Sequence, residues 1–193
     1  MASEYCAFVE KSRKFTRAEF VAKLQKILAL VYLKMSLLKE DSGEDLMDGE
    51  PEAFLSEYDY EHIRSIVSAR LGSLDCYIDI MQPGTPDTET EQMEVSQCVA
   101  DVYHNLKNFV ENFRTGSEDA ARASRMELIA DFRDTWGIRA LSLLAAVHIF
   151  VYNRTDDDDD DDSDYYNNNR NDNATHAGNT LINNFMDSYR RRN

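Results

Sequence analysis

The chain has 193 residues, with only 7 glycines, 3 prolines and 30% charged residues, a composition typical of long helices joined by short connections. Its formal net charge of −15 disfavours direct binding to nucleic acid phosphates and to anionic membranes. The charge is uneven, because residues 1–154 hold 26 acidic and 17 basic side chains while residues 155–193 hold 10 and 4. We therefore divide the chain into a domain, 1–154, and an acidic tail, 155–193.

The N-terminus and the cysteines both indicate a cytoplasmic protein. The first residues, MASEYCAFVEK, lack the basic start and the apolar run of a signal peptide. Three cysteines, Cys6, Cys76 and Cys98, are widely spaced and have no CxxC motif. This pattern fits reduced thiols better than a disulfide framework or a zinc site.

Two helices are predicted at the start of the chain, over residues 3–12 and 16–38. Ser3 is the predicted N-cap of the first helix. The sequence TRAE at 16–19 is a capping box, in which a hydroxyl and a carboxylate each accept a hydrogen bond from a free backbone N–H. Apolar residues then recur at spacings of three and four, which is typical of one buried helix face. They are Phe20, Val21, Leu24, Ile27, Leu28, Val31, Met35 and Leu38.

The middle of the chain is predicted to contain a loop, a helix and a turn. Residues 39–57 are acidic and contain glycine and proline, which indicates a surface loop. A third helix is predicted over 58–71, with Gly72 at its C-terminal cap. Residues 73–81 fit either a further helical turn or an extended piece. The sequence PGTP at 83–86 then enforces a turn.

Two further helices follow. A second capping box, TETE at 88–91, predicts the start of a fourth helix that runs to about Arg114. Ser117 is the predicted N-cap of a fifth helix, which has acidic residues in its first turn and reaches residue 135 or 136. Gly137 is expected to mark a bend before the last helix of the domain.

The last helix of the domain, ending at Tyr152, is apolar on nearly every face in its second half. A helix of this kind belongs in the centre of a bundle. A membrane span needs roughly 20 apolar residues, whereas this run has about 13 and includes Ser142 and His148. The predicted fold class is all-α: a single bundle of about six helices around a buried C-terminal core helix, followed by a disordered acidic tail.

The tail is predicted to be mostly disordered. Seven consecutive Asp residues at 156–162 repel one another, and the Asn-rich stretch at 167–173 has little to bury, so we expect disorder over 155–179. Residues 180–192 regain a helical pattern, and a short amphipathic helix on a flexible linker is a common partner-docking element. Folding back onto the bundle and disorder are the alternatives. The candidate docking residues are Leu181, Ile182, Phe185, Met186 and Tyr189.

Four stretches carry a resemblance to a known family: YCAFVE at 5–10, TRAEF at 16–20, VYHNLK at 102–107, and TWG at 135–137 before an Ala/Leu-rich helix. In this order and spacing, the chain resembles an uncharacterised bacterial family catalogued as domain of unknown function number five thousand and sixty-three. The resemblance covers roughly residues 3–152 and does not reach the tail. It implies an all-helical cytoplasmic domain and supplies no activity, cofactor or catalytic residue.

Two Asp-x-x-His pairs, Asp59/His62 and Asp101/His104, are the sharpest indication of a metal site. A carboxylate and an imidazole three residues apart share a helix face, and helical bundles can hold two metals with such pairs. However, the second pair lies on the polar stripe of the predicted fourth helix and is expected to face water, so no metal is assigned. That stripe consists of Asp101, His104, Asn108 and Glu111.

A second candidate site is a pocket formed by Arg133, Trp136, Arg139 and His148. Cations beside an indole can bind an anion or an aromatic group. The alternative is that Trp136 plugs the end of the bundle while the arginines pair with nearby acids. His148 is expected to be buried and hydrogen-bonded, because an unpaired buried polar group costs about 1–3 kcal/mol.

Three functions follow from these observations. The first is a non-enzymatic, cytoplasmic adaptor or regulatory domain that binds another protein through its acidic surface or its tail; a basic partner would bind in a salt-dependent way. The second is a bundle enzyme or small-ligand binder with a pocket near Trp136, Arg139 and His148. The third is an acidic mimic of nucleic acid. No phosphate-binding loop, nucleophile motif or zinc spacing occurs, so no catalytic residue or cofactor is assigned.

Overall fold

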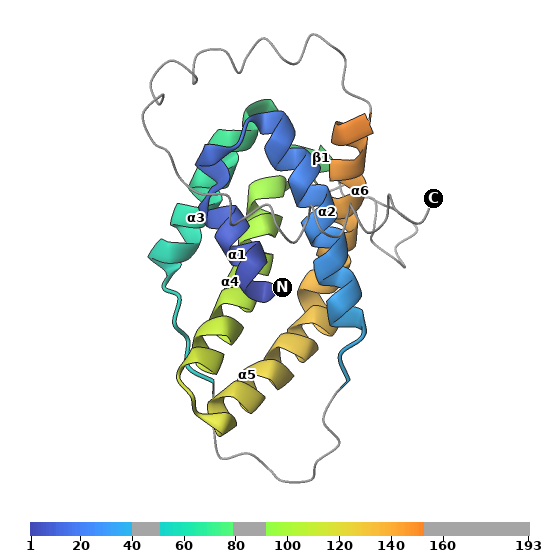
Figure 1. Cartoon of the computed structure of the whole chain (residues 1–193). Coiled ribbons are helices and arrows are strands. Elements are labelled where there is room, and N and C mark those ends of the chain that lie inside the picture. The colour runs from blue at the N-terminus through green and yellow to red at the C-terminus, as the bar shows by residue number, and fades with distance from the viewer. Residues whose placement is uncertain (40–50, 79–91, 153–193) are drawn as a thin grey trace, which may run out of the picture. The chain divides into compact units, whose positions relative to one another are not determined.

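The computed structural model describes residues 1–39, 51–78 and 92–152 (Figure 1). Within these ranges the protein consists of six α-helices and one short β-hairpin, so the predicted all-α bundle is confirmed. The chain separates into two units, Met1–Thr155 and Asp156–Asn193. The predictions of disorder over 155–179 and of a docking helix at 180–192 lie outside the described residues.

Of the first two helices, the second begins at its predicted N-cap and the first does not. Helix α1 (Ala2–Glu10) starts one residue before the predicted cap, because the N-terminal ammonium pairs with Glu4 in the first turn. Helix α2 (Arg17–Ser36) begins with the predicted capping box. Thr16 Oγ1 accepts a 3.1 Å hydrogen bond from the Glu19 backbone N–H, and Glu19 Oε2 accepts one of 3.0 Å from the Thr16 N–H. A 3-10 turn (Ser12–Lys14) connects the two helices.

Helix α3 (Glu57–Leu71) carries a further capping box that was not predicted, between Ser56 and Asp59. The helix ends at Gly72, as predicted. Gly72 has a φ of 55°, which side chains with a Cβ rarely adopt. A 3-10 turn (Gly72–Leu74) then leads to the next element.

A short antiparallel hairpin follows, formed by β1 (Cys76–Ile78) and β2 (Gln92–Glu94). The extended alternative for residues 73–81 is therefore the correct one over β1. Helix α4 (Val95–Arg114) starts after β2, so the prediction that it starts at the box 88–91 is wrong. The box itself lies outside the described residues.

Asp75, just before β1, is the residue that caps α4. Its Oδ1 accepts a 2.7 Å hydrogen bond from the Ser96 backbone N–H and its Oδ2 one of 2.8 Å from Ser96 Oγ. The Asp75 carbonyl oxygen also accepts a 3.2 Å hydrogen bond from the Val95 N–H. A carboxylate at this position satisfies free backbone donors and interacts favourably with the helix dipole.

The last part of the domain is one continuous helix from Glu118 to Tyr152. It comprises α5 (Glu118–Asp131), a π-helical turn (Phe132–Trp136) and α6 (Gly137–Tyr152). Ser117 caps α5 as predicted. Gly137 follows the π turn, where a Cβ would collide with the carbonyl oxygen of Phe132, so the close backbone approach requires glycine.

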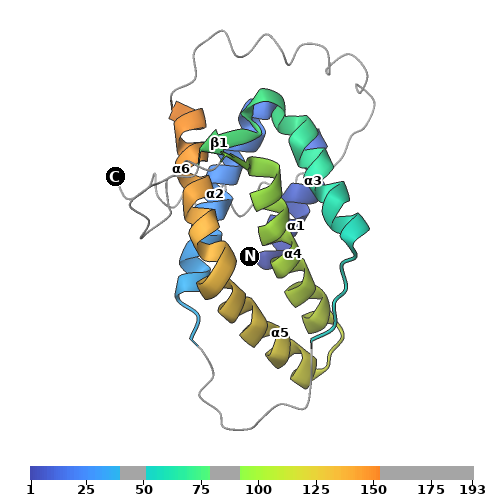
Figure 2. The same cartoon turned by 180° about the vertical axis from the view of Figure 1, so that it is seen from behind.

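Helix α4 is the centre of the bundle. It packs against α1, α3, α5 and α6, as the two views show (Figures 1 and 2). Its buried side chains include Val95, Cys98, Val99, Ala100, Val102, Tyr103, Leu106 and Val110. The sequence predicted that the last helix of the domain would be the buried core helix. The structure differs, because α6 packs mainly on α2 and leaves Ile138 and Ile149 exposed.

The continuous helix Glu118–Tyr152 contains an 18-residue window, with a mean hydropathy of 1.4, that is long and apolar enough to cross a membrane. In this structure 39% of that window is buried within the protein. Core helices of soluble proteins meet the same criteria, so the window alone does not indicate a membrane span.

Candidate functional site

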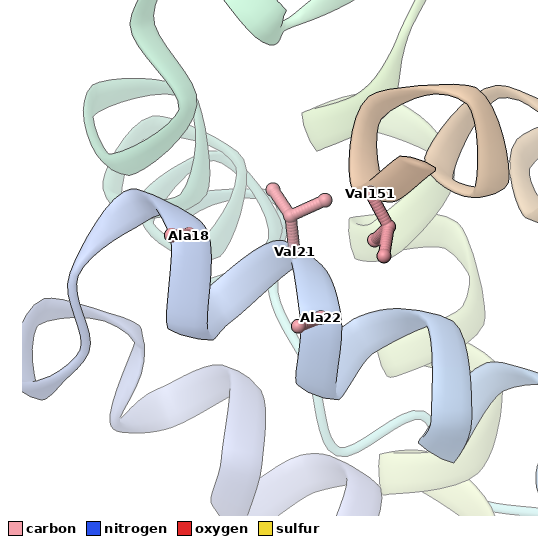
Figure 3. Close-up of a pocket in the computed structure, with 4 residues that line it drawn as sticks. All are labelled: Ala18, Val21, Ala22 and Val151. Atoms are coloured by element: carbon pink, nitrogen blue, oxygen red, sulfur yellow. The ribbon is translucent and has the colours of Figure 1, made fainter. Parts of the chain in front are cut away.

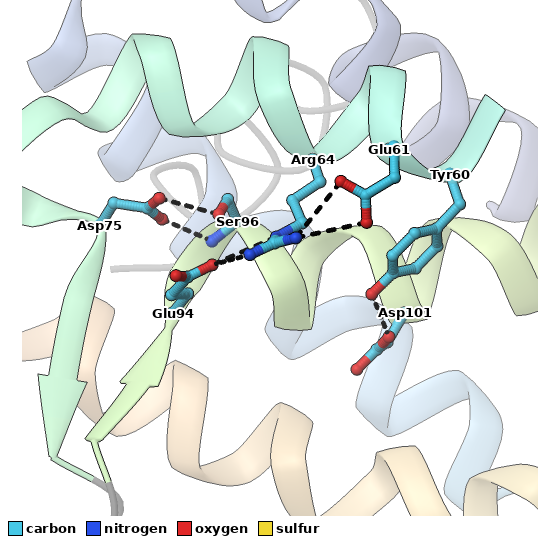
Figure 4. A network of polar contacts seen from close by, with 7 residues as sticks. All are labelled: Tyr60, Glu61, Arg64, Asp75, Glu94, Ser96 and Asp101. Carbon is cyan, nitrogen blue, oxygen red and sulfur yellow. Dashed lines mark hydrogen bonds and ion pairs between the residues drawn. The ribbon is translucent and has the colours of Figure 1, made fainter. Parts of the chain in front are cut away.

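The carboxylate of Asp101 connects three helices, and Figure 4 shows its contact with Tyr60. Its Oδ1 accepts a 2.8 Å hydrogen bond from the Tyr60 hydroxyl of α3, and its Oδ2 accepts one of 3.1 Å from Arg139 Nη1 of α6. Burial and the bond to Asp101 raise the pKa of Tyr60 well above its usual value, so the phenol remains a donor at neutral pH. The prediction that Asp101 faces water is therefore wrong: only 20% of its side chain is exposed.

His104 lies beside this cluster, between α3 and α5. Its ring meets the Tyr60 ring edge-on, with 6.1 Å between the centroids. Burial raises the pKa values of Glu127 and Asp131 on α5. The negative charge of Asp131 raises the pKa of Glu127 further, and the negative charge of Asp134 raises the pKa of Asp131 further. A positive charge on His104 would lower both values. The surface between α3 and α5 therefore carries ionisable side chains that are partly buried.

The two Asp-x-x-His pairs have separate surroundings. Asp59 accepts hydrogen bonds from the backbone N–H and the hydroxyl of Ser56, at 3.0 and 2.6 Å, and so completes the capping box of α3. These bonds lower the pKa of Asp59. His62 stacks on Tyr58, with 6.5 Å between the ring centroids. Over residues 1–39, 51–78 and 92–152, no three His, Cys, Asp or Glu side chains are grouped as metal ligands.

Two asparagines of α4 hold the segment that precedes α3. Asn112 Oδ1 accepts a 3.0 Å hydrogen bond from the Glu52 backbone N–H, and its Nδ2 donates one of 2.9 Å to the Glu52 carbonyl oxygen. Asn108 Oδ1 accepts hydrogen bonds from the backbone N–H groups of Phe54 and Leu55 at 3.0 and 3.1 Å. Asn108 was expected to face water, but instead it fixes a neighbouring segment of the chain.

Two of the stretches that carry the family resemblance meet at the junction of α1 and α4. Tyr103 donates a 2.9 Å hydrogen bond to Glu10 Oε1, and Lys107 Nζ lies 3.1 Å from the same oxygen. Lys107 also pairs with Glu111 at 3.2 Å. Burial and the bond to Glu10 raise the pKa of Tyr103. This polar contact fixes the first helix against the central one.

The predicted pocket residues Trp136, Arg133 and Arg139 have different neighbours. Trp136 is only 1% exposed and meets the Phe132 ring edge-on at 4.8 Å between centroids. Arg133 pairs with Asp134 at 2.8 Å, while Arg139 binds the α4 carboxylate described above. These placements match the alternative in which Trp136 plugs the bundle and the arginines pair with acids.

His148, the fourth predicted pocket residue, is exposed rather than buried. It lies at the edge of the contact between α6 and α2, where its Nδ1 is 3.2 Å from Nε2 of Gln25. Its ring also lies 4.6 Å from that of Tyr152. The expected hydrogen bond is thus present, but at the surface, because α6 is covered on one side only.

The described surface includes two hollows. The smaller, of about 180 Å³, lies between α2 and α6 and is lined by Ala18, Val21, Ala22 and Val151, so it offers no charged side chain (Figure 3). The larger, of about 420 Å³, lies where α2 ends beside the π turn. It is lined by Met35, Ser36, Leu38, Lys39, Ile129, Phe132 and Arg133. Of the four predicted pocket residues, only Arg133 borders either hollow.

Comparison with known proteins identifies the family. The model of a family described as "Domain of unknown function (DUF5063)" matches residues 1–153. The chain belongs to the DUF5063 family. The crystal structure of protein BF1032 from Bacteroides fragilis is similar, with 28% identity and a TM-score of 0.70, over 80% of this chain and 90% of that one. No curated protein matches. The DUF5063 match ends next to the last residue of α6, so the predicted family and its extent are confirmed.

The outer face of α2 in this DUF5063 chain carries exposed leucines that were not predicted from the sequence. On the side of α2 opposite its buried residues, Leu33 is 53% and Leu37 66% exposed, and Leu30 is partly exposed. We define the α2 outer face by Lys23, Lys26, Leu30, Leu33, Lys34 and Leu37. Its sequence signal is a second apolar stripe at spacings of three and four, behind the stripe that forms the core.

Proposed function

We propose that this DUF5063 domain is a non-enzymatic, cytoplasmic protein-binding domain with an adaptor or regulatory role. The observation that carries the proposal is a set of large apolar side chains on the described surface. Where large apolar side chains gather on one face of a protein, they mark a protein–protein interaction site. On α2 and at its C-terminal cap these are Leu33 at 53% and Leu37 at 66% exposed; on other helices they include Tyr152 at 67%, Phe113 at 66% and Ile149 at 51%.

The positions of the ionisable groups support a binding role over a catalytic one. Asp101 connects three helices, Asp59 caps a helix and Glu10 joins α1 to α4. Each carboxylate accepts hydrogen bonds that stabilise the bundle. A catalytic acid or base would instead need to reach a substrate from a pocket.

The charge of the chain supports association steered by electrostatics. A net charge of −15 would speed the approach of a basic partner and make binding weaker at high salt. The same charge would serve an acidic mimic of nucleic acid, and DNA would then compete for the partner. Competition by DNA therefore separates the mimic from an ordinary protein-binding domain.

A small-ligand site is the second candidate, and the larger hollow beside the π turn favours it. Apolar side chains such as Ile129 and Phe132 line this hollow together with the cation of Lys39. An amphipathic anion would fit such a lining. A thermal melt of the full chain that shifts upward with a bound anion would support this candidate.

The test of the proposal is affinity purification of the full chain from its native cytoplasm. We expect a protein partner in stoichiometric amount at about 0.1 M salt and much less of it at about 1 M. The metal content of the same preparation is measured in parallel. Absence of a partner together with stoichiometric metal would contradict the proposal and indicate chemistry inside the bundle.

A further inference from the structure

The α2 outer face is an apolar stripe at the edge of the bundle. Helix α2 packs mainly on α6 and also contacts α1 and α3, and Figure 1 shows it at the periphery. Leu30, Leu33 and Leu37 follow one another at spacings of three and four, so they lie side by side on one helix face. From Leu30 to Leu37 the stripe is about 10 Å long, at about 1.5 Å per residue. It is long enough for two turns of a partner helix.

Lysines flank this stripe and are not neutralised. Lys26 and Lys34 are exposed, and Lys23 lies over the Phe15 ring, with its Nζ 4.0 Å from the ring centroid. Among the described residues, none of these three lysines forms an ion pair.

Residues 11–39 as a whole hold eight basic side chains and a single acidic one, Glu19. The α2 outer face is therefore a local positive region on a chain with a net charge of −15.

This combination of charges discriminates between occupants. A second copy docked through the same face would place lysines against lysines, which is repulsive. An anionic membrane is an extended surface that would attract the lysines but repel the rest of the strongly acidic chain, whereas a single helix meets the lysine-bearing face alone. A helix with apolar anchors and flanking carboxylates matches both the leucines and the lysines.

We propose that the α2 outer face is the docking site for an acidic amphipathic helix of a partner protein. The inference rests on the proposed protein-binding function and adds the location of the contact and the chemistry of the docking helix; the rest of the partner can be basic and respond to the net charge of the chain. Leu33 and Leu37 are the apolar anchors, and Lys26 and Lys34 pair with carboxylates of the partner helix. Desolvated apolar anchors surrounded by charged pairs are the common design of such helix-binding sites.

The test uses the full chain with the photo-crosslinking residue p-benzoylphenylalanine in place of Leu33, expressed in its native cells. The matched control carries it in place of Tyr58, which is 78% exposed on α3. We expect position 33 to form a protein product whose cross-linked peptide is acidic and amphipathic, and position 58 to form none. The double change Lys26→Glu and Lys34→Glu should reduce the yield from position 33 by about tenfold.

The other outcomes overturn the inference in distinguishable ways. A protein product from position 58 and none from position 33 would leave the binding function standing and reject the site. A product with a second copy, with lipid or with a basic peptide would reject the proposed occupant. No protein product from either position would contradict the binding function itself.

Discussion

The hydroxyl of Tyr60 and the carboxylate of Asp101 meet at 2.8 Å across the junction of α3 and α4. The same carboxylate binds Arg139 at 3.1 Å, so α6 is joined to this junction as well. A polar side chain on the central helix thus positions two of its neighbours. This relationship explains why α4 can be strongly amphipathic and still lie at the centre of the bundle.

Changing Tyr60 to Phe should lower the free energy of unfolding by about 1.5 kcal/mol, because it removes a hydrogen bond to a charged, partly buried group. Asp101→Ala should cost more, since it leaves both Tyr60 and Arg139 without this acceptor. Urea denaturation measures both effects. The control is Tyr58→Phe, whose ring is 78% exposed and which should change little. Equal effects at positions 58 and 60 would contradict this role.

Asp75→Ala should lower the stability of the domain by about 1–2 kcal/mol, the usual effect of removing a helix N-cap. The loss arises because the Ser96 N–H and hydroxyl lose their acceptor at the start of α4. Thr88→Ala, in the capping box that the sequence predicts, should have little effect. Thermal and urea unfolding measure the loss of stability in both variants. A larger loss for Thr88→Ala than for Asp75→Ala would show that the helix starts earlier.

Asp131→Asn should stabilise the domain at about pH 7. Burial and the charge of Asp134 raise the folded-state pKa of Asp131 above its usual 3.8, so the ionised form costs stability, and this cost appears as the pH rises through that range. The gain should vanish at about pH 3, where the carboxyl is protonated in both states. Asp119→Asn, in the favourable first turn of the same helix, should instead destabilise. Urea unfolding at both pH values measures the free energy of unfolding of each variant. An equal gain for Asp131→Asn at both pH values would contradict the raised pKa.

The three cysteines should differ in reactivity. Burial raises the pKa of the Cys6 thiol to about 12, and Cys98 is buried as well, whereas Cys76 is exposed. Iodoacetamide at about pH 8 should therefore modify Cys76 first and Cys6 only when the domain unfolds. Mass spectrometry of the timed reaction gives the order, and Cys76→Ser should remove the fast phase. Modification of Cys6 as fast as Cys76 would show that the N-terminal helix opens readily.

Signals that act within one turn of helix were predictable from the sequence. The box between Thr16 and Glu19, the cap at Ser117 and the end at Gly72 depend only on neighbouring residues, and all three are present. The start of α4 was not predictable in this way. Its cap, Asp75, lies on the far side of the hairpin, and a residue brought close by strand pairing leaves no local pattern.

The site was harder to predict than the fold. Periodicity showed that Asp101 and Asn108 lie on a polar stripe, but it could not show that Tyr60 and the segment before α3 cover that stripe. The apolar character of α6 suggested burial on all sides, although Ile149 is 51% exposed. Hydrophobicity gives the cost of exposure, whereas the number of neighbouring helices decides which faces are buried.

The most direct measurement of the protein-binding role is the amount of partner recovered with the full chain carrying Leu37→Asp. We compare it with the unchanged chain and with Tyr58→Asp, which places an acidic residue at a more exposed position in the first turn of α3. The proposed role predicts about a tenfold loss of partner for Leu37→Asp alone, with a melting temperature that falls only slightly because the acidic residue lies at the C-terminal end of α2. Equal recovery by all three chains, or no partner with any of them, would contradict it.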